Sequence, residues 1–195
     1  MLQTIDRVID LTDPTLNDLL NVDVDRARSL VAAGDTAGLA GVRGSFALVG
    51  VQQPHVRLAR TLDRPLRYFL AKRVDGPLLI VADRMDAIAA YLDEQGLTGQ
   101  FHPSYTRMVP AHHIVEIHLI GCPDPNPRYD RFFTPAMNAL STDLDAIGAA
   151  YIGRLAEAID AHLDGIPDEA PVGVAFSGGV DSGAVLLVTE HLLLR

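Results

Sequence analysis

The stretch GVAFSGGVDSG, residues 173–183, decides the fold of the C-terminal part of this chain. The short apolar run at 172–176 predicts a buried strand. Ser177 and two glycines follow it, and Asp181 and Ser182 stand at the start of an apolar stretch with helical spacing. A strand, loop and helix of this kind present unpaired N–H groups and the positive end of the helix dipole, and the glycines let a ligand approach the backbone. The sequence therefore predicts a phosphate-binding loop here.

The composition describes a folded protein without a basic surface. The chain has 195 residues, of which 48% are hydrophobic, so it is long enough for one core or for one and a half. The formal net charge is −9, whereas nucleic acids and anionic membranes are bound by clusters of lysine and arginine. Lys72 is the only lysine, which excludes a Walker-type loop with its Gly-Lys-Ser/Thr. We therefore expect no nucleic-acid partner, no membrane partner, and a phosphate loop that works without a nearby ammonium group.

Cysteine use and the first residues indicate the compartment. Cys122 is the only cysteine, so neither an internal disulfide nor a thiolate metal cluster can form, and its place between a glycine and a proline suggests an incidental thiol. Residues 1–20 carry four acidic side chains and no continuous apolar core. No stretch reaches the ~20 apolar residues of a membrane span. These features predict a cytoplasmic protein without a signal peptide.

The first two thirds of the chain predict helical structure followed by an antiparallel sheet. Apolar residues at helical spacing indicate helix over 13–40, with Gly34 as a terminator. Short apolar runs separated by Gln-Pro, Asp-Arg-Pro and Asp-Gly-Pro turns then predict four strands. These runs are 45–51, 56–61, 67–70 and 78–82. The stretch MDAIAAYLDEQG after them predicts a helix that ends at Gly96.

The pattern changes in the last third of the chain. The stretch 107–121 predicts one or two more strands, and the proline-rich stretch 122–135 predicts an irregular connection between domains. Apolar residues recur every three or four positions over 144–163, which predicts a long amphipathic helix with Thr142 and Asp145 in a capping box. A helix, a buried strand, a glycine loop and a second helix are the opening of a doubly wound α/β domain.

The glycine loop resembles that of the PP-loop ATP pyrophosphatases, which cleave ATP between the α and β phosphates. SGGVDS at 177–182 fits their Ser-Gly-Gly-x-Asp-Ser pattern. Backbone N–H groups and the hydroxyls of Ser177 and Ser182 are then expected to hold the leaving pyrophosphate. A carboxylate is repelled by a polyphosphate unless a cation bridges them, so Asp181 is expected to hold Mg²⁺. The ATP and pyrophosphate site expected from the resemblance comprises Phe176, Ser177, Gly178, Gly179, Val180, Asp181 and Ser182.

The region before the loop resembles the asparagine synthetase group, which includes β-lactam synthetases and lasso-peptide cyclases. Their N-terminal glutaminase or glutaminase-like domain has a G-x-F-A strand, a strand rich in Arg and Asp, a PL-x-Y segment, a strand before a helix, and a P-P-G-H segment. The corresponding segments here are GSFAL at 44–48, LARTLDRPLRY at 58–68, LIVAD at 79–83 and VPAH at 109–112. The resemblance covers about residues 40–195 and implies an α/β protein. An α+β glutaminase-like sandwich is expected over residues 1–135, and the first part of a doubly wound PP-loop synthetase domain over residues 136–195.

Departures from the family narrow this expectation. Glutaminase activity in the group uses a cysteine exposed after removal of the first methionine, but this chain begins Met1-Leu2. It has no Asn-Gly-Glu segment, and the residues before Gly44 are too few for the front of a full glutaminase domain. The family's synthetase domain also continues far beyond the loop, with a second acidic metal ligand and a lysine. We expect a degenerate, non-hydrolytic first domain and a second domain that needs a missing segment or another polypeptide.

The resemblance implies an ATP-dependent carbon–nitrogen ligase that releases AMP. The carboxylate of a small molecule or peptide would be adenylated, and free ammonia or an amino group of the substrate would displace AMP. A non-catalytic subunit that binds ATP or a partner is the alternative, and assembly into a homo-oligomer stays open. A PP-loop tRNA-modifying enzyme is disfavoured by the acidic charge, the upstream domain and the lack of a cysteine pair.

Other polar residues have simpler explanations than a site. His112 or His113 could meet His118 at a metal, but two imidazoles without a carboxylate or thiolate make a poor zinc site. The arginines of 57–73 are interleaved with strands and balanced by acidic residues, so they predict a solvated sheet face. Gly183 replaces a serine common in the family, which removes one hydroxyl and leaves the backbone of the loop intact.

Overall fold

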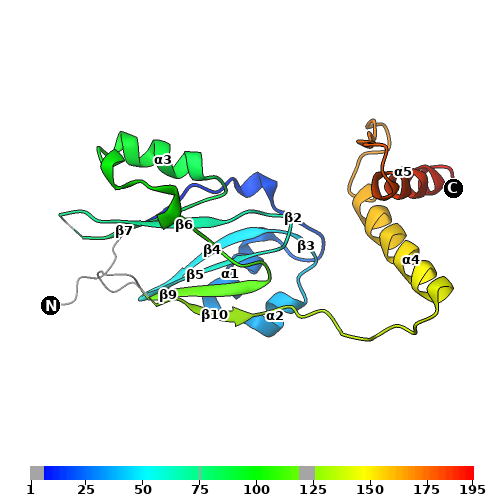
Figure 1. Cartoon of the computed structure of the whole chain (residues 1–195), viewed down its shortest axis with the longest axis horizontal. Helices are drawn as coiled ribbons and strands as arrows, with labels where there is room; N and C mark the ends of the chain where they lie inside the picture. Colours follow the sequence, from blue (N-terminus) through cyan, green and yellow to red (C-terminus); the bar gives the residue numbers. More distant parts are fainter. Residues whose placement is uncertain (1–6, 75, 119–125) are drawn as a thin grey trace. The chain divides into compact units, whose positions relative to one another are not determined.

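The computed structural model describes residues 7–74, 76–118 and 126–195, and Cys122 lies outside them (Figure 1). The chain divides into two compact units, Met1–Pro135 and Ala136–Arg195, which we call unit 1 and unit 2. Helices and sheets together give a general α/β fold. Within the described residues, no helix combines the length and the apolar character that crossing a membrane requires.

The first sheet of unit 1 has four strands and is mixed. Its order is β1 (Arg7–Asp10), β7 (Leu78–Ala82), β6 (Arg67–Ala71) and β8 (Arg107–Met108). β6 and β7 confirm two predicted strands. β6 and β7 pair antiparallel, as expected for these runs, whereas β1, a strand that was not predicted, joins β7 in parallel, with Ile9 opposite Ile80.

The second sheet of unit 1 is antiparallel throughout. Its order is β10 (Arg128–Arg131), β9 (His113–His118), β5 (His55–Arg60) and β4 (Ala47–Gln52). The predicted irregular connection at 122–135 is therefore wrong where β10 pairs with β9, and residues 122–125 lie outside the description. A small additional ladder joins β2 (Asp18–Leu19) to β3 (Gly44–Ser45).

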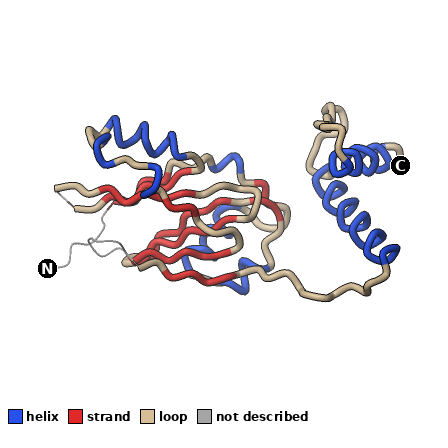
Figure 2. Tube along the Cα trace, in the orientation of Figure 1, coloured by secondary structure: helices blue, strands red, loops and turns tan. Residues whose placement is uncertain are grey.

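Three apolar clusters set the layers of unit 1, and the central one fills the space between the two sheets. It includes Leu58 and Val115 from the second sheet and Leu79 from the first. The outer face of the second sheet packs on α1 (Val24–Ala33) and α2 (Thr36–Ala40), and the outer face of the first packs on α3 (Met85–Glu94). Unit 1 is thus a four-layer stack of helices, sheet, sheet and helix (Figure 2).

Continuous helix over 13–40 is not what forms. A single 3₁₀ turn, η1 (Pro14–Leu16), and strand β2 occupy the first part, because Asp13 caps the turn that Pro14 begins. The Asp23 carboxylate accepts a hydrogen bond from Arg26 N and starts α1, and Asp35 does the same for α2 from Gly38 N. Side chains that bond to the backbone favour such helix starts. Gly34 ends α1 with φ 70°, as predicted.

Gly50 in β4 allows the close approach of α1. A Cβ atom at Gly50 would lie 2.5 Å from Ala32 N and 2.6 Å from Ala32 Cα. Both are backbone atoms, so only a shift of the helix could make room for a side chain. The absence of a side chain at this position therefore sets the distance between the helix and the sheet.

Two arginines of the 57–73 stretch are buried, so the expected solvated face is wrong for them. Arg60 is 8% exposed, and its guanidinium donates hydrogen bonds to the carbonyl oxygens of Val109, Thr61, Leu62 and Arg64. The Arg64 side chain is 11% exposed and forms an ion pair with Asp83 at 3.1 Å. The planar guanidinium can satisfy several carbonyls at once, which explains an arginine inside the fold.

Unit 2 contains two helices, α4 (Leu144–Leu163) and α5 (Val180–Leu193), which contact one another. The bounds of α4 are those predicted. Its start differs from the predicted capping box, because the Asp143 carboxylate accepts a hydrogen bond from Asp145 N at 2.9 Å. Asp143 immediately precedes the helix and reaches the N–H of its second residue, so Asp143 and not Thr142 is the N-cap.

Candidate functional site

The start of α5 is open towards a ligand. Gly179 is the N-cap with extended backbone (φ −90°, ψ 166°), and no side chain caps the helix. The hydrogen-bond ladder begins where Gly183 N donates to Gly179 O at 3.0 Å. The N–H groups of Val180, Asp181 and Ser182 therefore have no acceptor inside the helix. These three donors and the helix dipole favour an anion at this point.

The hydroxyl of Ser182, in the first turn of α5, contacts the loop that precedes the helix. It donates to Gly179 O at 3.1 Å and lies 3.0 Å from the Ser177 hydroxyl. Ser177 N also donates to it at 3.2 Å. The two serines of the motif are thus brought together, and both hydroxyls lie at the exposed start of α5. A hydroxyl can rotate to donate to an incoming oxygen without any movement of the backbone.

Gly178 gives the loop its turn. Its φ is 84°, in the left-handed region that side-chain-bearing residues adopt at a cost. A Cβ atom there would meet nothing within 4 Å, so the requirement for glycine comes from the backbone conformation and not from crowding. The space in front of the loop stays open to a ligand.

The remaining predicted site residues are exposed around the same loop. Phe176 is 58% exposed and Val180 is 88% exposed. Asp181 supplies the one carboxylate of the first turn of α5. The described residues contain no group of three or more side chains that could hold a metal on their own. A single carboxylate fits Mg²⁺, which takes one or two carboxylates and completes its shell with phosphate oxygens and water.

The predicted strand at 172–176 does not form. Its residues have no strand assignment, and their backbone makes no hydrogen bond to any described residue. A strand needs a partner, and the described residues of unit 2 contain no other strand. The run is apolar, but the described residues of unit 2 offer no second strand that could pair with it and bury it.

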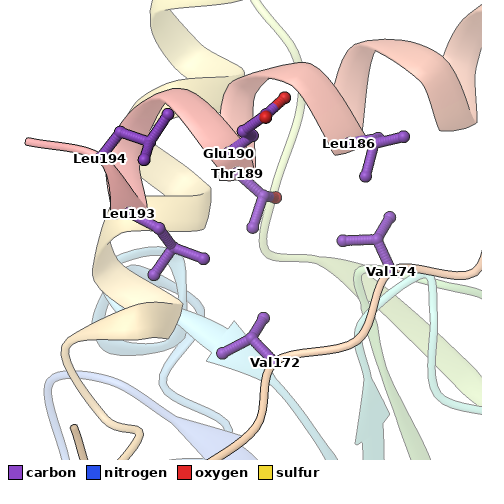
Figure 3. A pocket seen from close by; sticks show the side chains of 7 residues that line it. All are labelled: Val172, Val174, Leu186, Thr189, Glu190, Leu193 and Leu194. Atoms are coloured by element: carbon purple, nitrogen blue, oxygen red, sulfur yellow. The ribbon is translucent and has the colours of Figure 1, made fainter.

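An apolar groove in unit 2 was not predicted. It has a volume of about 570 Å³ and lies between the 172–174 backbone and one side of α5 (Figure 3). The residues that line it are Val172, Val174, Leu186, Thr189, Glu190, Leu193 and Leu194. The signal for it was present in the sequence, because α5 is apolar on more than one face, which is typical of a helix covered on several sides.

The three histidines do not gather around a metal. His112 has φ 58° and lies against Phe132 and Phe133, with ring centroids 5.8 and 5.0 Å away. Burial lowers the pKa of His112, and the nearby cations Arg131 and Arg60 lower it further. His113 Nδ1 lies 2.7 Å from Ala111 O.

His118 stands apart from the other two. Its ring stacks on that of His55, with centroids 4.6 Å apart across the β5–β9 ladder. The three imidazoles thus have separate local partners and no common centre.

No family model matches this chain, and no curated protein matches it. The assignment of a function therefore rests on the loop at 177–182 and on the fold that carries it.

Proposed function

We propose that this chain is part of an ATP-dependent ligase of the asparagine synthetase type, which forms an amide and releases AMP and pyrophosphate. The observation that carries the proposal is the motif at 177–182 together with its geometry. The motif's second glycine is the N-cap of a helix without a side-chain cap, its first glycine has a positive φ, and its two serine hydroxyls lie 3.0 Å apart. A glycine turn that binds no ligand does not require this combination of features.

In the proposed reaction a carboxylate oxygen of the substrate attacks the α-phosphorus of ATP. The bond from that phosphorus to the bridging oxygen breaks, and pyrophosphate leaves with the electron pair. The N–H groups at the start of α5 and the hydroxyls of Ser177 and Ser182 hold the oxygens on which charge develops. Asp181 would hold Mg²⁺, which supplies neutralisation of the phosphate charge when bound. An amine then attacks the acyl-adenylate carbon, and AMP leaves with the formation of the amide.

The fold of unit 1 supports the family proposed. Its two facing sheets, covered by helices on both outer sides, agree with a glutaminase-like sandwich. The sequence GSFAL forms β3 and the start of β4, and LIVAD forms the last four residues of β7 and the residue after it. The proposed amine source is free ammonia or an amino group of the substrate.

The measurement that tests this proposal is carboxylate-dependent exchange of labelled pyrophosphate into ATP. The chain is assayed alone and with any polypeptide that co-purifies with it. Exchange that requires Mg²⁺ and a carboxylate supports the ligase, with or without a second polypeptide. ATP binding with no exchange under any condition would show that the chain is not a ligase.

A pair of variants assigns the metal ligand. Asp181→Asn keeps the size of the side chain but removes the charge, so Mg²⁺-dependent binding of pyrophosphate should weaken at least about tenfold. Asp168→Asn removes one charge from an exposed turn of the same unit and should leave binding unchanged. Calorimetric titration with magnesium pyrophosphate measures both, and equal affinities would exclude Asp181 as the ligand.

A non-catalytic nucleotide-binding subunit is the second candidate function. One observation favours it: unit 2 contains no lysine, and its only arginines are Arg154, paired with Glu157, and Arg195. Charge on a departing pyrophosphate is usually stabilised by cations, and the sequence of this unit supplies only these two, neither of them within the loop at 177–182. The exchange assay separates the two functions, since only the ligase incorporates label.

A further inference from the structure

Many apolar side chains of unit 2 are exposed to solvent. The three clusters of buried apolar residues contain no residue of this unit, and α4 has no buried residue. Leu187 on α5 is 66% exposed, and the groove residues Leu193 and Leu194 are 57% and 80% exposed. A helix apolar on several sides is typical of the interior of a larger assembly.

The groove has an unpaired backbone along one side. Residues 172–176 run beside α5, and Val172 and Val174 point into the groove opposite Leu186 and Leu193 (Figure 3). The N–H and C=O groups of this segment bond to no described residue. Burial of such groups without a partner is costly, so whatever covers the groove must also hydrogen-bond to them. An extended strand does both, because it offers a backbone edge together with alternating apolar side chains.

The acidic charge of unit 2 indicates what charge the polypeptide that covers the groove should have. Unit 2 has nine aspartates and glutamates but only two arginines, so it carries most of the chain's formal net charge of −9. Glu190 lies in the groove itself, and Asp168 and Glu169 precede the unpaired segment closely. A second copy of unit 2 would bring two strongly acidic surfaces together, which is unfavourable. A basic polypeptide would be attracted to the same surface.

We infer that the groove along α5 is the docking site of a basic polypeptide that adds an apolar strand beside residues 172–176. This inference rests on the proposed function in one respect: the added polypeptide would also bring to the loop the cations that unit 2 lacks. The docking itself depends only on the uncovered apolar surface, the unpaired backbone and the acidic charge.

Two synthetic peptides test the docking site on the full chain. Both share a central run of alternating valine and threonine, and one is flanked by lysines while the other is flanked by glutamates. Fluorescence anisotropy at low salt should show the lysine peptide binding at least about tenfold more tightly, with a difference that shrinks as salt screens the charges. Equal affinities, or no binding of either peptide, would overturn the inference.

A matched pair of variants locates the peptide. Leu186→Asn and Leu187→Asn make the same change at neighbouring positions of α5, but only Leu186 lines the groove. Loss of one buried leucine contact should weaken binding of the lysine peptide about tenfold in Leu186→Asn and leave it unchanged in Leu187→Asn. Equal effects of the two variants would place the peptide elsewhere and contradict the inference.

Backbone pairing needs its own readout. Hydrogen exchange of the amides of 172–176 should be fast in the free chain and slowed when the lysine peptide is bound. A peptide N-methylated at every residue cannot pair through either edge of its backbone and should give no protection. Amides already protected in the free chain, or protected equally by the N-methylated peptide, would overturn strand addition.

The test of the docking site and the test of the ligase function can give different results. Peptide binding is measured without ATP, and pyrophosphate exchange is measured without the peptide. Binding of the lysine peptide in a chain that never exchanges pyrophosphate would keep the docking site and reject the ligase. Pyrophosphate exchange by the chain without any added polypeptide would support the ligase function and would contradict a requirement for the docked strand.

Discussion

Two apolar runs of the same length, LLIVA in β7 and VGVAF at 172–176, have opposite fates in this molecule. All five residues of β7 are buried, paired with β1 on one side and β6 on the other. None of the residues 172–176 is buried, and none belongs to a strand. The difference does not come from the local sequence, since both runs are apolar and bounded by turn residues. It comes from the presence or absence of neighbouring strands, because strand formation depends on pairing and burial more than on intrinsic preference.

The same contrast holds for the helices of the two units. In α1 the residues Ala27, Leu30 and Val31 are buried against the second sheet of unit 1. The longer helix α4 has an apolar repeat of similar spacing but no buried residue. The apolar residues of unit 1 are thus buried by other residues of the same unit, as the sequence pattern predicts, whereas those of α4 in unit 2 are not. Substitutions made in both units test whether this difference in packing is real.

The largest effect is expected for a leucine between the sheets of unit 1. Leu79→Ala removes a fully buried side chain from the central cluster, so the opening free energy of the β7 amides should fall by about 2–5 kcal/mol. Leu187→Ala removes a side chain that is largely exposed and should change the opening free energy of α5 by less than about 0.5 kcal/mol. Native-state hydrogen exchange measures both regions in one chain. A similar loss at both positions would show that α5 is covered.

Glycine-to-alanine changes should have opposite signs in the two units. Gly50→Ala places a Cβ atom against the backbone of Ala32 and should destabilise unit 1 by about 1–3 kcal/mol. A Cβ atom at Gly153 in α4 meets nothing within 4 Å, so Gly153→Ala should stabilise that helix by about 0.5–1 kcal/mol. Urea unfolding followed by tyrosine fluorescence reports mainly on unit 1, since Tyr151 is the only tyrosine of unit 2.

Helix content from circular dichroism, measured against temperature, reports on Gly153→Ala. A loss of helix in this variant would mean that another surface packs closely on α4 at Gly153. A Gly50→Ala variant as stable as the parent chain would mean that α1 is free to move away from β4.

The smallest effect is a dependence of stability on pH that belongs to unit 1. Burial and the cations Arg131 and Arg60 hold the pKa of His112 below its ordinary value of 6.5 in the folded state. The unfolded chain therefore binds the proton more readily, and unit 1 should lose stability as the pH falls below about 6.5. In His112→Asn this loss should be smaller, and asparagine tolerates the positive φ of 58° at this position.

Urea unfolding between about pH 7.5 and pH 5.5 measures the effect of His112→Asn. His102→Asn is the matched control, because His102 is exposed and an asparagine can keep its capping role before Ser104. The two variants should differ in slope and not only in overall stability. Identical slopes would show that His112 does not carry the pH dependence.

Much of unit 1 follows from its sequence because its signals are local. The runs that became β5, β6 and β7 are apolar and bounded by proline turns, and α4 in unit 2 has the predicted bounds. Strand β1 was not predicted, since RVID is short and β7, with which it pairs, lies about seventy residues away. The division of 13–40 could have been predicted from Asp23 and Asp35, which cap the two helices.

The candidate site was predictable as a set of residues but not as an arrangement. A six-residue motif names Ser177 and Ser182, but their contact depends on the turn at Gly178 and on the start of α5 at Val180. The groove beside α5 depends on how the 172–174 backbone lies, which no local pattern records. The burial of Arg60 was missed for the same reason, because its four carbonyl partners come from two segments far apart in the sequence.

The guanidinium of Arg60 also determines how unit 1 opens. It donates hydrogen bonds both to the turn at 61–64 and to Val109, so neither segment can move away without breaking hydrogen bonds to Arg60. The two loops are therefore expected to fluctuate as one cooperative unit, with a shared free energy of opening. A single side chain thereby couples two segments that lie far apart in the sequence, and we expect them to open together.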